Sequence, residues 1–272
     1  MDARAAALPP PRRWRRPPLF IQSRAWRYAI YGGALLYLLL ALSTFDVNWQ
    51  RVLDGMERGG RFVAGFLTPD FLSRGGAIWR GFAESLTMTA TSTVAGIVLS
   101  VPIGIGAARN VAPPWVYMVC RSIIAISRSF QEIILAILFV AMFGFGPFAG
   151  FLTLSFATIG FLSKLLAEDI EDIDEAQAEA IRATGAGWWQ VINYGIQPQV
   201  MPRLIGLSLY RLDINFRESA VIGIVGAGGI GATLNVAMDR YEYDTAAAIL
   251  LLIIVIVMAS EYASSAIRKR IQ

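Results

Sequence analysis

Long apolar runs alternate with short polar stretches along the chain. Four runs contain no charged residue, and they occupy 28–45, 85–108, 133–163 and 245–260. About 18 or more apolar residues can cross a bilayer as a helix, and a run of about 30 is too long for one ordinary span. The runs lack the period-two alternation that a transmembrane β-barrel requires. We therefore expect an all-α polytopic membrane protein.

The runs and the breaks between them predict six transmembrane helices. These spans are expected at 27–45, 82–108, 115–143, 148–167, 202–225 and 245–267. The chain then divides into a basic Pro/Arg-rich tail over 1–26, a first anchor helix over 27–45, an interfacial segment over 46–81 and a membrane core over 82–272, with a cytoplasmic loop at about 168–199.

The interfacial segment has its own helical pattern. Trp49, Val52, Leu53 and Met56 fall at positions i, i+3, i+4 and i+7, with charged residues elsewhere on the wheel. This pattern predicts an amphipathic helix lying at the outer membrane interface. A helix packed against the other spans fits the pattern equally well.

Basic residues cluster at both ends of the chain. The first 27 residues carry seven arginines against one aspartate, and Arg268, Lys269 and Arg270 lie among the last five. Basic residues that flank spans stay in the cytoplasm, so both termini are expected there and the number of spans is expected to be even. A cleaved secretory signal is disfavoured, because the first apolar run has the length of a span and no clear small-residue cleavage site follows it. We expect the tail to lie near membrane lipid and to bind no nucleic acid.

The composition excludes several kinds of site. Only 16% of the residues are charged, against about a quarter in soluble domains. The absence of histidine removes the commonest metal ligand and the commonest general base, and the single cysteine cannot form an intrachain disulfide. No P-loop motif is present. We expect no metal, no bound cofactor and no catalytic residue in this chain.

One glycine-rich stretch matches the pattern G-x-G-x-x-G. Its glycines are Gly226, Gly228, Gly229 and Gly231. A dinucleotide site needs a strand before this motif and a helix after it, whereas here the motif ends an expected span and leads into an outer loop over 226–244. A flexible or tightly packed turn explains the glycines better.

Ionisable and polar residues lie within two of the expected spans. They are Arg121, Arg128, Ser129, Gln131, Glu132, Arg211, Asp213, Arg217 and Glu218. Spacings of seven and four predict one helical face for Arg121, Arg128 and Glu132. In the later span Asp213 and Arg217 can pair at i, i+4, and Arg211 and Glu218 share a face.

Charges inside a membrane are costly and indicate a site by default. These arginines could line a route for an anion, because guanidinium groups suit phosphoryl oxygens. They could instead pair with the acids and lock the helices together, and we favour this interpretation because each arginine has an acid nearby in the sequence.

The polar loop between the fourth and fifth spans carries the most specific motif. Glu179 and Ala180 are followed by Gly185, six residues after the glutamate, and by Pro198, nineteen residues after it. This spacing resembles the "EAA" signature of permease subunits of binding-protein-dependent ABC importers, which reads E-A-A, three residues, G, nine residues, I-x-L-P. The chain departs from it with Ile181 for the second alanine, with Gly195 for the isoleucine and with Gln197 for the leucine.

Three further segments are similar to the phosphonate-type members of that family. They are RSFQE at 128–132, TIGFLSKLLAE at 158–168 and ESAVIGIVGAGGIG at 218–231. The similarity runs from about 81 to the C-terminus. In the first segment the family commonly has R-S-I-P-E, so Phe130 and Gln131 replace Ile and Pro. The missing proline leaves open whether the helix kinks there, and it also leaves open a different ligand, such as phosphite.

The resemblance implies a type I ABC importer permease in the bacterial inner membrane. A second permease copy in a homodimer, two ATP-binding subunits carrying ATP and Mg²⁺, and a periplasmic binding protein would complete the complex. The expected function is import of phosphonate or a related phosphorus oxyanion by alternating access. The alternatives are a permease of the same family for phosphite, phosphate or another small solute and, from other classes, a stand-alone channel or a membrane-embedded enzyme.

The resemblance also implies that the polar loop docks in a groove of the ATPase. Two short helices are expected around a turn formed by Gly185 and Gly187, with Glu179 at the joint. Trp188, Trp189 and Val191 would be exposed apolar contacts. Packing of the loop beneath its own bundle is the alternative.

Overall fold

The computed structural model describes residues 23–45 and 48–271, and all regular structure in these ranges is helical. The chain divides into two compact units, 1–59 and 60–272. The first unit contains α1 (Arg24–Ser43) and the start of α2 (Trp49–Phe66). Ser23 caps α1, since its hydroxyl accepts a hydrogen bond from the Trp26 backbone N–H at 3.3 Å. The helix buries none of its side chains, so its apolar surface is left for lipid or a partner.

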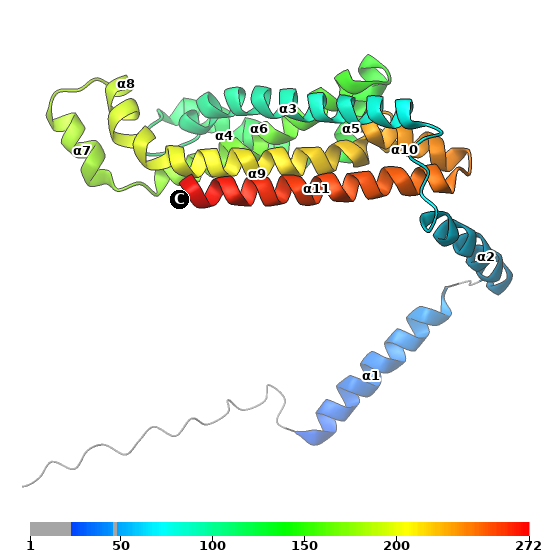
Figure 1. The fold of residues 1–272 in the computed structure, drawn as a ribbon. Coiled ribbons are helices and arrows are strands. Elements are labelled where there is room, and N and C mark those ends of the chain that lie inside the picture. Colours follow the sequence, from blue (N-terminus) through cyan, green and yellow to red (C-terminus); the bar gives the residue numbers. More distant parts are fainter. Residues whose placement is uncertain (1–22, 46–47, 272) are drawn as a thin grey trace, which may run out of the picture. The chain divides into compact units, whose positions relative to one another are not determined.

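The second unit is a bundle of long helices with shorter helices between them (Figure 1). In chain order they are α3 (Gly75–Gly106), α4 (Pro114–Ser129), α5 (Glu132–Phe143), α6 (Pro147–Glu171), α7 (Glu175–Ala183), α8 (Trp188–Gln190), the π-helix η1 (Val191–Ile196), α9 (Gln197–Ile224), α10 (Gly229–Asp239) and α11 (Tyr243–Ile271). Five helices of the described chain are long and apolar enough to cross a membrane, or six if the bent pair α4–α5 is one span.

Small residues allow α3 and α6 to pack closely along their lengths. A Cβ atom added at Gly96 would lie 2.4 Å from the Thr158 methyl group, and one added at Gly104 would lie 2.8 Å from the Leu166 side chain. Lipid provides no hydrophobic drive between helices, so close backbone approach and van der Waals contact have to hold them together. This pair forms the centre of the bundle, and α9 packs against both helices.

The span expected over 115–143 is bent. It divides into α4 and α5, which meet at an angle of 93°, so the kink that the sequence left open at Phe130 and Gln131 is present. Phe130 and Gln131 have extended backbone angles, with ψ of 137° and 141°, so the hydrogen-bond ladder stops between them although neither residue is a proline. The break also overturns the prediction that Arg121, Arg128 and Glu132 share one helical face, because Glu132 begins a new helix.

The expected outer loop over 226–244 is also wrong, because most of it is the helix α10. Two residues of α3 cap this helix. The Glu84 carboxylate accepts a hydrogen bond from Gly229 N–H at 3.2 Å, and the Ser85 hydroxyl accepts one from Ile230 N–H at 2.9 Å. Helix N-termini favour such acceptors, so a distant segment supplies the cap that the loop itself lacks.

The two ends of the bundle differ. The helices α7 and α8 lie at one end, together with the end of α11, and α10 lies at the other (Figure 1). A buried apolar cluster that includes Leu166, Ile170, Val191, Ile192 and Ile196 joins η1 to the ends of α6 and α9. The polar loop of the sequence is therefore a packed extension of the bundle.

Candidate functional site

The α7–η1 hairpin, residues 174–196, has strong local determinants. The Asp174 carboxylate caps α7 by accepting a hydrogen bond from Ala176 N–H at 3.1 Å. Gly185 follows the end of α7 with φ of +81°, a conformation that side chains disfavour. The Gln190 side chain then accepts a hydrogen bond from Gly187 N–H at 2.8 Å and starts α8. The hairpin contains two helices around a glycine turn, and η1 continues the second helix.

The residues of the E-A-A motif lie on α7. Glu179 and Ala180 are exposed, and Ile181 is half-buried against the apolar cluster. Ala178 is buried and faces η1, where a Cβ atom added at Gly195 would lie 3.1 Å from the Ala178 Cα atom. The glycine at 195, where the family pattern has isoleucine, thus allows η1 to approach α7 closely.

The two tryptophans of the hairpin have different surroundings. The Trp188 indole N–H donates to the Val111 carbonyl oxygen at 3.2 Å and ties the hairpin to the turn between α3 and α4. Trp189 is 67% exposed and has no such bond among the described residues. The prediction that Val191 is exposed is wrong, because Val191 is only 5% exposed and belongs to the buried cluster.

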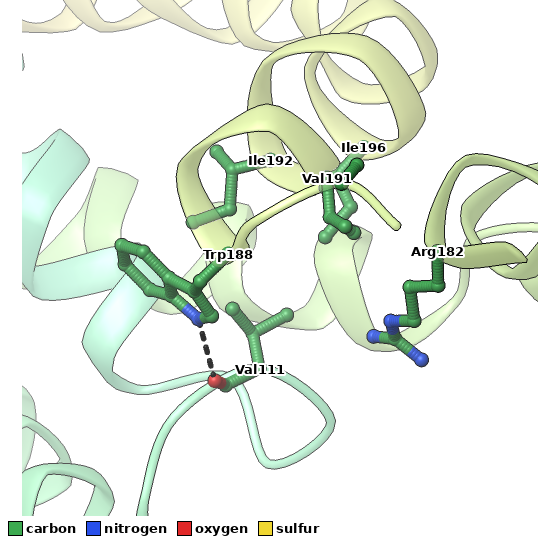
Figure 2. Close-up of a pocket in the computed structure, with 7 residues that line it drawn as sticks. Val111, Arg182, Trp188, Val191, Ile192 and Ile196 are labelled. Carbon is green, nitrogen blue, oxygen red and sulfur yellow. Dashed lines mark hydrogen bonds between the residues drawn. The ribbon is translucent and has the colours of Figure 1, made fainter. Parts of the chain in front are cut away.

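A cavity of about 240 Å³ opens beneath the hairpin. Figure 2 shows the indole of Trp188 on one side and the guanidinium group of Arg182 on the other, with the apolar side chains of η1 between them. Both residues are exposed on the surface of the described chain. The hairpin therefore places the Trp188 indole, the Arg182 guanidinium group and the apolar side chains of η1 around one cavity.

The two ends of the hairpin are fastened together. The Gln199 side chain accepts a hydrogen bond from Asp174 N–H at 3.0 Å and donates to the Gly195 carbonyl oxygen at 2.7 Å. Pro198 is exposed in the first turn of α9, where its missing N–H costs nothing. The N-cap of α7 and the end of η1 are thus both bonded to the start of α9.

A second group of polar residues lies within the membrane core around Arg211. Its side chain is 4% exposed, and its guanidinium group lies 3.3 Å from Glu218 and 3.8 Å from Glu132. The Nε–H group donates to the Thr158 hydroxyl at 3.2 Å, and the guanidinium carbon lies 5.4 Å from the centre of the Phe161 ring. Arg211 therefore joins α9 to α5 and α6.

Asp213 and Arg217 form a separate pair on α9. They approach to 3.0 Å, and the Ser260 hydroxyl of α11 donates to Asp213 at 2.5 Å. Asp213 is buried, whereas the Arg217 side chain is 56% exposed. A guanidinium group exposed on the wall of a spanning helix has to meet water or a partner, since lipid would not solvate it.

The remaining candidates of the broken span separate into two places. Arg121 pairs with Glu171 at 2.8 Å and donates to the Ala107 carbonyl oxygen, so it locks α4 to the ends of α3 and α6. Arg128 lies at the break, with Ser129 and Gln131 beside it. The Ser129 hydroxyl donates to its own helix, and Gln131 occupies the N-cap position of α5 without a side-chain capping bond. These residues and Arg211 do not form a single line of charges.

The glycine-rich turn is tightly packed. A Cβ atom added at Gly231 would lie 1.9 Å from the Ala220 carbonyl oxygen, and Gly226, Gly228 and Gly229 have φ of 95°, 80° and 74°. No strand precedes the motif within the described chain. This geometry has the form of a tight helix-to-helix turn and lacks the framework of a dinucleotide site.

The sequence matches a family model over residues 100–272, and that family is the binding-protein-dependent transport system inner membrane component. The chain belongs to this family. It is a multi-pass protein of the bacterial inner membrane, and its all-α fold is that of the ABC importer permeases.

Two relatives of this permease are named for phosphate import and for phosphite transport. It is 44% identical over 252 residues to the phosphate-import permease protein PhnE of Mycolicibacterium smegmatis, and 38% identical over 222 residues to the phosphite transport system permease protein PtxC of Stutzerimonas stutzeri. These alignments cover 92% and 81% of this chain, but 47% and 79% of the relatives. The chain thus spans about half the length of the mycobacterial protein.

A solved structure shares the fold of this permease. The permease of the MetNI methionine ABC transporter, in an inward-facing conformation, matches with a TM-score of 0.62 and 25% identity. The match covers 74% of this chain and all of that one. The helical fold of this chain is therefore that of a solved ABC transporter.

Sequence reasoning missed several residues that position the candidate site of this permease. Asn215 is fully buried and donates to the Thr93 and Thr158 hydroxyls at 2.8 and 2.9 Å. Ser260 and Gln199 hold Asp213 and the hairpin, as described above. Asn215 could have been found from the sequence, because it lies one helical turn after Arg211 and therefore on the same face. The partners of Ser260 and Gln199 could not, because they depend on the tertiary fold.

Proposed function

We propose that this chain is the transmembrane subunit of an ATP-driven importer that moves phosphonate or a related phosphorus oxyanion into the cell. Phosphite and phosphate are the alternative substrates. The α7–η1 hairpin is the observation that carries the proposal, because it presents the E-A-A residues on an extension at one end of a membrane bundle. The names of the phosphate- and phosphite-importing relatives support the class of substrate.

In this proposal the chain has no covalent chemistry of its own. Two separate subunits bind ATP and Mg²⁺, and a binding protein on the outer face selects the solute. A second permease completes the complex, and we propose an identical copy. The exposed face of Trp189 and the carboxylate of Glu179 form the contact to the ATPase, since exposed aromatic groups next to a charge are typical of interfaces.

The hairpin transmits the ATPase movement to the membrane. Closure of the two ATPases displaces α7, and the bonds of Gln199 to Asp174 and Gly195 carry this displacement to α9. The helix α9 bears Arg211 and Arg217, so its movement changes which charges face the route. ATP shifts the inward- and outward-open populations only by as much as it binds one state better than the other.

Reconstitution tests the proposal. The chain is placed in proteoliposomes with its ATPase and binding protein, and ATP-dependent uptake of labelled phosphonate, phosphite and phosphate is measured beside sulfate. We expect uptake of at least one phosphorus oxyanion that requires ATP, the ATPase and the binding protein. Uptake that persists without the ATPase would identify a channel instead, and chemical conversion of the solute would identify an enzyme.

A further inference from the structure

A cavity of about 220 Å³ lies where α4 ends and α5 begins. Its wall contains Arg128 and Phe130 from the break, Glu132 from α5, Ala157 and Phe161 from α6, and Arg211 from α9. We call this space the break cavity. We propose that it binds a tetrahedral phosphorus oxyanion, which the guanidinium groups of Arg128 and Arg211 hold. The inference rests on the proposed function and adds a solute site within the membrane.

Arg128 differs from the other arginines of the membrane core. Arg121, Arg211 and Arg217 each form an ion pair with an acid within 3.3 Å. Arg128 is exposed at the cavity and has no ion pair within the residues that the structure describes. An uncompensated charge in a broken span is costly unless water or an anion meets it, so Arg128 supplies a cation that is free to receive a ligand.

Arg211 contributes a second cation that is already oriented. Its Nε–H is held by the Thr158 hydroxyl, and Glu218 is its nearer carboxylate. The other carboxylate, Glu132, lies 3.8 Å away, which is beyond hydrogen-bond distance. A phosphoryl oxygen can therefore replace Glu132 beside the guanidinium group while the other two contacts remain, and guanidinium groups suit such oxygens geometrically.

The break itself adds to the attraction. The helix α5 begins at the cavity wall, and the first backbone N–H groups to bond back to Gln131 are those of Ile134 and Leu135. The N–H groups before them carry the positive end of the helix dipole. Broken membrane helices place this end toward anionic solutes in other transporters.

Size and wall chemistry favour a small ion that is held weakly. Pockets for drug-sized ligands have volumes of about 300–1,000 Å³, so this cavity suits an ion of a few atoms with some water. The rings of Phe130 and Phe161 lower the local dielectric and strengthen the charge interactions. The Glu132 carboxylate repels an anion and so limits its affinity for the cavity. A site on a transport route needs a limited affinity, because the solute has to leave.

A phosphoryl group could reach the cavity from a transported solute or from a phospholipid headgroup. Thiol protection distinguishes the two sources. Cys120, the only cysteine, is replaced by alanine and Ala157→Cys places a thiol in the cavity wall. We expect inorganic phosphate or phosphite to slow labelling of this thiol by an anionic methanethiosulfonate in the complete complex. Protection that is present without added solute and disappears in phosphate-free glycolipid would identify the headgroup and overturn the solute site.

Transport provides the second measurement. We expect Arg128→Gln to lower the kcat/KM of uptake by about tenfold, as the loss of one charged hydrogen bond predicts, and to abolish the thiol protection. Arg128→Lys keeps the charge but lacks the planar guanidinium group, so its kcat/KM of uptake should lie between those of the wild type and Arg128→Gln. Arg80→Gln removes an exposed arginine outside the cavity and should transport like the wild type.

Three outcomes are separable. If the wild-type complex takes up no phosphorus oxyanion, the proposed function itself fails. If the wild type transports and Arg128→Gln transports equally well, only the break cavity is excluded as a site. If Ala157→Cys is not labelled at all, uptake by Arg128→Gln and Arg128→Lys still decides the question.

Discussion

The Thr158 hydroxyl group donates to the Leu154 carbonyl oxygen at 2.6 Å and accepts from Arg211 and Asn215. Thr158→Val removes the acceptor of the buried Arg211 Nε–H group and one of the two acceptors of the Asn215 amide. We therefore expect the free energy of unfolding to fall by about 1–2 kcal/mol. Thr91→Val is the matched control, because the Thr91 hydroxyl is exposed and bonds only within its own helix. Unfolding by a denaturing detergent measures both variants, and equal stabilities would contradict the proposed dependence of Arg211 on Thr158.

Gly195 is the second residue whose size matters. Gly195→Ile restores the residue of the family pattern, yet its Cβ would press on the Ala178 backbone at 3.1 Å. Overpacking of this kind costs about 1–3 kcal/mol, so we expect a lower melting temperature in detergent and weaker binding of the ATPase. Gly187→Ala is the control, since only Gln190 approaches that position and the backbone there is ordinary. A variant Gly195→Ile that is as stable as the control would show that η1 can move away from α7.

At the scale of elements, the turn of the α7–η1 hairpin depends on a left-handed conformation. Gly185 has φ of +81° and open space around it, so backbone conformation rather than contact decides which residues fit. Asparagine tolerates this region and a β-branched residue does not. We expect Gly185→Val to reach the membrane but to lose most ATP-dependent uptake, and Gly185→Asn to retain it. Uptake by the valine variant at the wild-type level would argue against a docking role for the turn.

The elements that were predicted correctly are those with local signals. Apolar runs identify spans because lipid requires continuous helices. The spacing of Glu179, Gly185 and Pro198 carried the family resemblance, and that resemblance implied the two short helices of the hairpin. The break at Phe130 and Gln131 carried no proline or glycine, so its signal was absent. The helix α10 was missed because its caps, Glu84 and Ser85, lie 145 residues away in the sequence. Tertiary contacts set the positions of these elements, and the hydrophobic periodicity of the sequence does not reveal such contacts.

At the scale of the whole molecule, one helix connects the two candidate sites. The start of α9 holds Gln199, which binds the hairpin, and twelve residues further along the same helix lies Arg211, which lines the break cavity. An α-helix rises about 1.5 Å per residue, so these two positions are about 18 Å apart along α9, with Pro202 between them. We propose that a displacement of the hairpin reaches the charged cluster through this helix.

The link at Gln199 can be broken without replacing a residue of the α7–η1 hairpin or of the break cavity. Gln199→Ala removes its bonds to Asp174 and Gly195, so the hairpin should still bind the ATPase but should no longer pull α9 with it. We expect ATP hydrolysis to continue while uptake per ATP falls by about thirtyfold, because two hydrogen bonds of about 1 kcal/mol each are lost. Gln197→Ala truncates an exposed neighbour and should keep the wild-type ratio. The ratio is measured in proteoliposomes from uptake and phosphate release together. Hydrolysis and uptake that fall in parallel would mean that Gln199 supports only the docking of the hairpin. The proposal that α9 passes the movement of the hairpin to Arg211 would then be wrong.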